Sequence, residues 1–196
     1  MRSLFNRLCV IIMVFTLPAC SIFGDNGNTE IAPYVVINQE PPFGVRYYKQ
    51  MVWVTTNMEG LDKARSPFFK LFDYISGDNN QEKEIPMTAP VFMDKGSDSV
   101  SKMSFVLPAD YTMSETPLPT DSEVIIEEIT DYTVATITFN GVLSQENIDK
   151  HKELLQKWIA DQDLVIVGEA KIAGYNPPFT IPALRRNEVL IPIKAP

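Results

Sequence analysis

A ten-residue apolar segment near the N-terminus divides this chain into a leader and a body. Residues 8–17 carry no charge, and they follow two basic residues, Arg2 and Arg7. A segment of this length is too short to cross a bilayer as a helix, but it has the length and the basic flank of the apolar part of a signal peptide. We therefore expect residues 1–19 to be a signal peptide, and the fold to be built from the residues after it.

The end of this leader, Leu17-Pro18-Ala19-Cys20, resembles the lipobox of bacterial lipoproteins. The resemblance implies cleavage after Ala19, with Cys20 becoming a lipidated N-terminus; an ordinary secretory peptide cut at the same bond is the alternative. Ser21 in place of aspartate resembles the sorting pattern that directs such proteins to the outer membrane, facing the periplasm. Residues 20–32 are polar and glycine-containing, which predicts a flexible tether between the lipid and the domain.

The cysteine count and the charge limit what the body can be. Cys9 and Cys20 are the only cysteines among 196 residues, so residues 33–196 contain no thiol and must be stabilised by their own core. The net charge is −8, and the leader holds two of the positive charges, so the body alone is more acidic still. An acidic domain repels phosphate backbones, which makes nucleic acid an unfavourable partner.

The hydrophobic pattern of the body predicts strand–strand–helix–strand–strand, twice. For the first half we expect a helix at Pro67–Ser76 and strands at Tyr34–Ile37, Val45–Val54, Ile85–Met93 and Lys102–Leu107. For the second half we expect a helix at Gln145–Asp161 and strands at Val124–Ile129, Tyr132–Phe139, Val165–Ile172 and Glu188–Ile193. Two such units can pair their sheets into a curved or barrel-like sheet with both helices packed on it, an α+β fold.

Local signals place the ends of these elements. Ser66-Pro67 is typical of a helix start, and Gly77 suits the left-handed position that follows a helix. Enrichment in β-branched and aromatic residues indicates the strands. Asp131 interrupts the strand pattern of the second half, where we expect a turn.

Three stretches resemble the SOUL haem-binding family. They are Leu71–Asn80 (a "YI-x-G-x-N" turn), Ile85–Val91 (an "I-x-M-T-x-P-V" strand), and Gly174–Pro178 leading into Arg185–Val189 ("GY-[DN]-PP … RRNE"). The resemblance covers about residues 32–196. It implies a distorted antiparallel β-barrel of two pseudo-symmetric halves with two packed helices, and binding of haem or another tetrapyrrole in an apolar cleft.

The first helix supplies the candidate walls of that cleft. Phe68, Leu71, Phe72 and Ile75 fall on one apolar face, which belongs either to the core or to a ligand site. The resemblance places this helix beside the tetrapyrrole cleft, where Met87 adds a soft apolar contact. Lys70 and Lys83 are either solvated or, as the resemblance implies, close to the propionates of a tetrapyrrole.

The C-terminal motif places a carboxylate at the start of a strand. Glu188 would be costly to bury alone, so we expect an ion pair with Arg185 or Arg186. Such a network would anchor the loop around Tyr175. The alternative is a pocket carboxylate that receives a cationic ligand or acts as a base in a small-molecule effector-binding or hydrolase domain.

His151 is the sole histidine, and therefore the sole imidazole that could ligate haem iron. It lies within the apolar stripe of the second helix, and a hydrogen-bonded residue of the helix face is the alternative. There is no metal-binding His/Cys spacing, phosphate-binding glycine loop or Gly-x-Ser-x-Gly motif. Enzymatic activity is thus the less favoured class, and an envelope interaction protein without a small ligand is a third possibility.

Overall fold

A computed structural model of the chain describes residues 29–58, 66–94 and 101–196. Its helices are α1 (Pro67–Ile75), α2 (Gln145–Asp161) and the short 3-10 helix η1 (Pro182–Leu184). Its strands are β1 (Glu30–Ile31), β2 (Val35–Glu40), β3 (Phe43–Asn57), β4 (Thr88–Ala89), β5 (Val91–Asp94), β6 (Lys102–Val106), β7 (Val124–Phe139), β8 (Lys171–Gly174) and β9 (Asn187–Pro192). The signal peptide and Cys20 lie outside the described residues.

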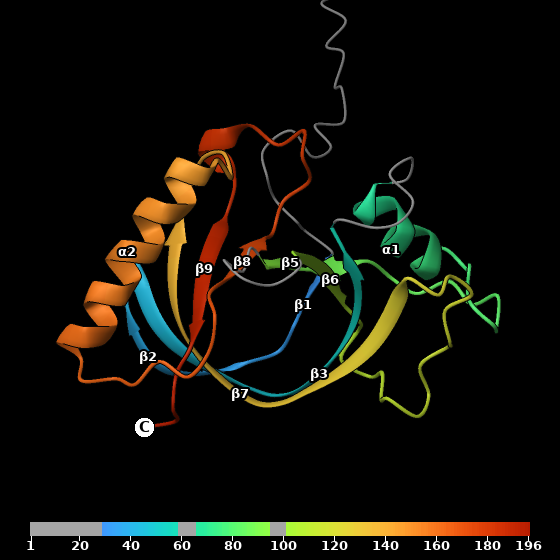
Figure 1. The fold of residues 1–196 in the computed structure, drawn as a ribbon, viewed down its shortest axis with the longest axis horizontal. Helices are drawn as coiled ribbons and strands as arrows, with labels where there is room; N and C mark the ends of the chain where they lie inside the picture. Colours follow the sequence, from blue (N-terminus) through green and yellow to red (C-terminus); the bar gives the residue numbers. More distant parts are fainter. Residues whose placement is uncertain (1–28, 59–65, 95–100) are drawn as a thin grey trace, which may run out of the picture.

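Six strands close into an antiparallel barrel, which confirms the α+β barrel expected from the sequence. They run in the order β3-β6-β5-β8-β9-β7, and the barrel closes because β3 also pairs with β7. Strand β2 extends the sheet beside the first part of β3. Figure 1 shows α2 packed on one side of the barrel and α1 at the opposite side, next to β6. In the described chain, no helix is both long and apolar enough to span a membrane.

The long strands β3 and β7 run through both halves of the molecule. Midway along each strand, the residues that face the barrel interior change from even-numbered to odd-numbered positions or the reverse. Tyr48 and Trp53 both join the cluster inside the barrel, although their positions differ in parity. On the outside, Val45 packs in the cluster beneath α2, whereas Val52 packs in the cluster beneath α1. Because successive side chains of a strand alternate between faces, the backbone must be offset between these two regions.

Asp131 lies at this offset, and the turn predicted there is wrong. Residues 124–139 form one continuous strand, and Asp131 adopts φ +50° within it while the pairing of β3 with β7 keeps one register on both sides. Its carboxylate accepts a hydrogen bond of 2.5 Å from the Tyr47 hydroxyl. Aspartate tolerates this left-handed conformation, so the residue that signals a turn instead marks the point where β7 exchanges its inner and outer faces.

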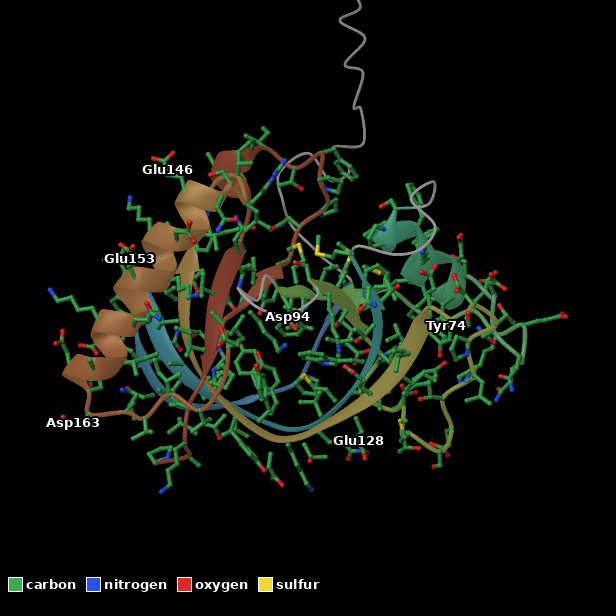
Figure 2. The ribbon with its side chains drawn as sticks, viewed as in Figure 1. Tyr74, Asp94, Glu128, Glu146, Glu153 and Asp163 are labelled. Atoms are coloured by element: carbon green, nitrogen blue, oxygen red, sulfur yellow. The ribbon has the colours of Figure 1, made fainter. Side chains whose placement is uncertain are left out.

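Each helix begins and ends close to where the sequence predicts. Helix α1 starts at Pro67 and ends at Ile75, with Gly77 at φ +110° just beyond it. Helix α2 has the predicted bounds, and the hydroxyl of its N-cap Ser144 accepts a hydrogen bond from the backbone of Asn147. Glu146 and Glu153 point away from the barrel on the exposed face of α2 (Figure 2).

Three other predicted segments differ from the structure. The predicted strand Ile85–Met93 is divided into β4 and β5 by Pro90, which lacks the N–H that a central strand needs. Only the end of Val165–Ile172 is a strand, since Val165–Val167 is exposed and Ile166 makes an isolated bridge to Ile193. The folded body also begins earlier than the expected tether allows, because β1 pairs with β4 and Ala32 is buried in the barrel core.

The conformation of Asp131 gives a test of the strand offset. Asp131→Gly and Asp131→Val both remove the hydrogen bond to Tyr47, but only valine is strained at positive φ. We expect the valine variant to be less stable than the glycine variant by about 1–2 kcal/mol, measured by urea unfolding. Thr130→Gly and Thr130→Val, at the neighbouring exposed strand position, serve as the control, and there the valine variant should be the more stable of the two. Equal stability of the two Asp131 variants would contradict the described backbone.

Candidate functional site

An open apolar groove lies between α1, the β4–β5 segment and the chain that follows β8. Its volume is about 360 Å³, at the lower end of the range of small-molecule sites. It is lined by Thr29, Phe68, Phe72, Met87, Thr88, Ala89, Val91, Gly174, Tyr175, Asn176, Pro177, Pro178 and Phe179. None of these side chains is charged.

Helix α1 divides its apolar residues between this groove and the core. Phe68 and Phe72, one helical turn apart, line the groove and stack with ring centroids 6.1 Å apart. Leu71 and Ile75 are buried against the barrel instead. Leu71 and Ile75 therefore belong to the core, whereas Phe68 and Phe72 stay candidates for a ligand site, and Met87 lies on the groove side with them.

Three polar side chains on the groove wall bond to the protein and leave a largely apolar surface. The Tyr175 hydroxyl donates to Glu188 at 2.8 Å, and the Thr88 hydroxyl donates to the carbonyl of Val106 at 2.5 Å. The side-chain oxygen of Asn176 accepts from the backbone N–H of Arg186. Because these groups already have partners, a ligand in the groove gains mainly by burying apolar area.

The loop after β8 forms the outer wall of the groove and is held by Arg185. Its guanidinium donates to the carbonyls of Thr180 at 2.8 Å and Pro178 at 2.5 Å. Pro177 and Pro178 restrict the backbone further. Arg185 thus braces this loop, and of the two arginines expected as alternative partners of Glu188 only Arg186 pairs with it.

Glu188 lies behind the groove, fully buried inside the barrel. Arg46 of β3 makes a bidentate pair with its carboxylate at 2.7 and 2.8 Å, and Arg186 donates to it at 2.7 Å. The hydroxyls of Tyr175 and Thr138 complete the shell. Both carboxylate oxygens are occupied, so the network anchors the barrel and leaves no open receptor for a cation or base for a substrate.

The electrostatics agree with a permanently charged pair. Burial alone would raise the pKa of Glu188, but the hydrogen bonds and charges of Arg46 and Arg186 lower it below its usual value. Burial and the neighbouring Glu188 charge raise the pKa of Tyr175 well above that of a free tyrosine. The carboxylate therefore stays ionised and Tyr175 stays neutral at ordinary pH.

Sequence reasoning missed Arg46, the strongest partner of this network. A signal was present, since Arg46 interrupts a strand of β-branched and aromatic residues, where a buried cation requires an anion. Its guanidinium also lies over the ring of Tyr34, with 4.5 Å to the centroid. The pairing with Glu188 spans 142 residues, which no local pattern can show.

His151 is not among the residues that line the groove. Its ring stacks on Phe139 of β7 with centroids 4.0 Å apart, and its Nδ1 lies 2.6 Å from the carbonyl of Asn147, one turn earlier in α2. His151 is therefore a hydrogen-bonded residue of the helix face, which was the alternative to an axial haem ligand. The two lysines do not line the groove either: Lys70 is buried against Glu123, and Lys83 lies over Tyr111.

The described residues offer few metal ligands. No cluster of three or more His, Cys, Asp or Glu side chains in the described ranges could hold an ion. Among the residues that line the groove, Met87 and Tyr175 have side chains of a type that ligates haem iron, and the tyrosine is already bonded to Glu188. The groove therefore fits the flat apolar face of a tetrapyrrole better than it fits an isolated metal ion.

A family model described as SOUL heme-binding protein matches residues 29–192, which include the barrel, both helices and the groove. The chain belongs to the SOUL heme-binding protein family. This membership confirms the resemblance carried by the three sequence motifs. Heme-binding protein 2 of Mus musculus is 30% identical over 168 residues, with 81% of each chain covered. Heme-binding protein 2 of Homo sapiens is 31% identical over 163 residues, covering 77% of this chain and 78% of that protein.

Solved structures share the architecture at much lower identity. The EcmrR C-terminal domain aligns with a TM-score of 0.55 and 12% identity, covering 79% of this chain and 98% of that chain. A hydrolase from Listeria innocua aligns with a TM-score of 0.56 and 9% identity, covering 78% of this chain and 91% of that chain. Identities this low show a common fold and nothing of ligand or activity.

Removing the Glu188 charge tests the buried network. Glu188→Gln leaves Arg46 buried without its anion, so we expect a loss of about 3–5 kcal/mol in the free energy of unfolding at neutral pH. Glu128→Gln, on the exposed face of β7 (Figure 2), should change stability by less than about 0.5 kcal/mol.

The stabilisation that Glu188 provides depends on pH. The folded-state pKa of Glu188 is lowered, so its stabilisation is complete above the ordinary carboxyl pKa and is lost as the pH falls through the folded-state value. The stability gap between wild type and Glu188→Gln should therefore narrow below about pH 4. Urea unfolding over a pH series measures it, and a gap that widens on acidification would contradict a charged Glu188.

Proposed function

We propose that this protein binds haem or a related tetrapyrrole in the groove beside α1, and that it does so as an exported lipoprotein. The single observation that carries the proposal is the open apolar groove between α1 and the loop after β8. An interaction protein with no small ligand would have this space filled by side chains. The heme-binding names of the mouse and human relatives support the same ligand class.

The shape and chemistry of the groove favour a large flat molecule. Phe68 and Phe72 present stacked rings on one side, and Pro177 and Pro178 present rigid apolar surface on the other. The groove has no charged side chain to pair with carboxylates, so the acidic groups of a tetrapyrrole would stay in solvent. When bound, the tetrapyrrole supplies the apolar face, and Met87 is the soft side chain near it.

Export and anchoring rest on the sequence of the leader. The apolar segment 8–17 and the lipobox-like ending at Cys20 support removal of residues 1–19 and lipidation of the new N-terminus. Ser21 supports an outer-membrane location facing the periplasm. The absence of any cysteine after Cys20 fits an exported domain that relies on its own core.

Titration with haemin tests the ligand. We expect the purified protein to give a saturable Soret shift near one equivalent. Phe72→Asp, which places a charge on the groove wall, should weaken binding at least about tenfold, because the carboxylate would be desolvated against an apolar ligand. His151→Ala should leave the spectrum unchanged, since His151 does not line the groove.

Phe69→Asp is the matched control. Phe69 lies on the same helix and is more exposed than Phe72, but it does not line the groove, so its haemin affinity should equal that of wild type. Equal losses in both aspartate variants would point to damage of α1 and would exclude the groove as the cause. No shift beyond that seen with an unrelated acidic protein would exclude haem.

Replacing Cys20 tests the anchor. Cys20→Ala should move the protein from the membrane fraction to the soluble fraction and abolish incorporation of labelled fatty acid, because the acyl chains provide the membrane affinity. Fractionation and metabolic labelling measure both effects. A wild-type protein that is already soluble and unlabelled would show that the lipobox-like ending is only a secretory cleavage site.

A further inference from the structure

The loop that forms the outer wall of the groove is an uncharged, exposed apolar segment. Residues 177–184 read Pro-Pro-Phe-Thr-Ile-Pro-Ala-Leu, and all except Thr180 are exposed. Phe179 is 76% exposed, and Ile181 and Leu184 are more than two-fifths exposed. An eight-residue stretch with no charge is unexpected on the surface of a chain with a net charge of −8, and exposed apolar patches mark surfaces that contact something.

Several backbone polar groups of this loop already have hydrogen-bond partners within the protein. Three of its residues are prolines and have no N–H to satisfy. The N–H of Thr180 bonds to the carbonyl of Pro177, and that of Leu184 bonds to the carbonyl of Ile181. Arg185 caps two more carbonyls, and the carbonyl of Pro182 accepts from Gly141. These bonds and the missing proline N–H groups lower the cost of moving the loop out of water.

The chain enters the domain at the same place. Thr29, the first described residue, lines the groove together with Phe179. Cys20 precedes Thr29 by nine residues, which span at most about 30 Å when extended. A lipid attached at Cys20 therefore holds this end of the domain close to the bilayer surface.

We propose that the loop of residues 177–184 is a membrane-contact surface, and that the groove opens toward the lipid. The occupant is the interfacial layer of a phospholipid bilayer, into which Phe179, Ile181 and Leu184 insert. The assignment rests on the proposed function in one respect, the anchor at Cys20. An apolar ligand dissolved in the membrane then meets the groove directly.

A second exposed apolar face is the alternative contact surface against which the loop can be compared. Val35, Val36 and Ile37 are exposed on β2, which lies at the lower left of Figure 1, whereas α1 and the connection from β8 to η1 lie in its upper part. The β2 face includes no residue of the groove, and it is farther along the chain from Cys20. If β2 were the contact surface, the groove would face away from the lipid.

Tryptophan placed on each face decides between them. Phe179→Trp and Val36→Trp are made in the full-length protein, purified without haem, and mixed with zwitterionic vesicles of phosphatidylethanolamine and phosphatidylcholine that carry brominated acyl chains, so that the net charge of −8 is not repelled by the surface. Bromine quenches tryptophan that reaches the acyl region. We expect the emission added by Phe179→Trp to fall by about half or more, and that added by Val36→Trp to stay unchanged. Leu184→Trp is a second probe of the loop and should behave as Phe179→Trp does.

The quenching results test membrane contact by the loop independently of haem binding. Quenching of Val36→Trp without quenching of the two loop probes would overturn it, as would the absence of quenching at all three positions. The measurement needs no haem, so a failure to bind haem leaves it intact. A mass spectrum of the same protein shows whether Cys20 is lipidated, and quenching of the loop probes alone supports the membrane surface in either state.

Discussion

The antiparallel pairing of β3 with β7 holds the two halves of this chain together, and the other features depend on it. The two strands stay in one register over nearly their whole length. Their shared offset near Asp131 turns one face toward α2 and the opposite face toward α1. The same pairing brings Arg46 into the barrel, where β9 presents Glu188. Barrel closure and the buried ion pair are thus two consequences of one strand pairing.

The barrel interior stabilises the fold, whereas the groove provides the candidate binding surface. The interior carries charge, but that charge is fully paired, so it stabilises and orients without being open to a ligand. The groove is apolar because its polar wall residues bond inward or along the backbone. Tyr175 belongs to both regions, since its ring lines the groove while its hydroxyl bonds to Glu188. The network therefore supports one wall of the groove.

Local sequence patterns predict the helices and include the family motifs. They fail where contacts between residues far apart in the sequence determine the structure. The Ser66-Pro67 start and the N-cap Ser144 are encoded by neighbouring residues, so the bounds of α1 and α2 can be predicted from the sequence. The continuity of β7 cannot, because Asp131 signals a turn until the pairing with β3 is known.

The same distinction applies to the site. The Phe68 and Phe72 side of α1, Met87 and Tyr175 could be nominated from the motifs. The assignment of Leu71 and Ile75 to the core needed the position of α1 on the barrel. Arg46 as partner of Glu188 needed the full fold, since the two residues are far apart in sequence.

The central claim is that the ligand binds beside α1 and not beside α2. Haemin is paramagnetic, so it broadens the NMR signals of nuclei near the iron. Addition of haemin to the isotope-labelled protein should broaden the Met87 methyl and the amides of residues 68–72 and 174–179, and spare those around His151. Broadening centred on His151 and α2, with the groove signals unchanged, would contradict the claim.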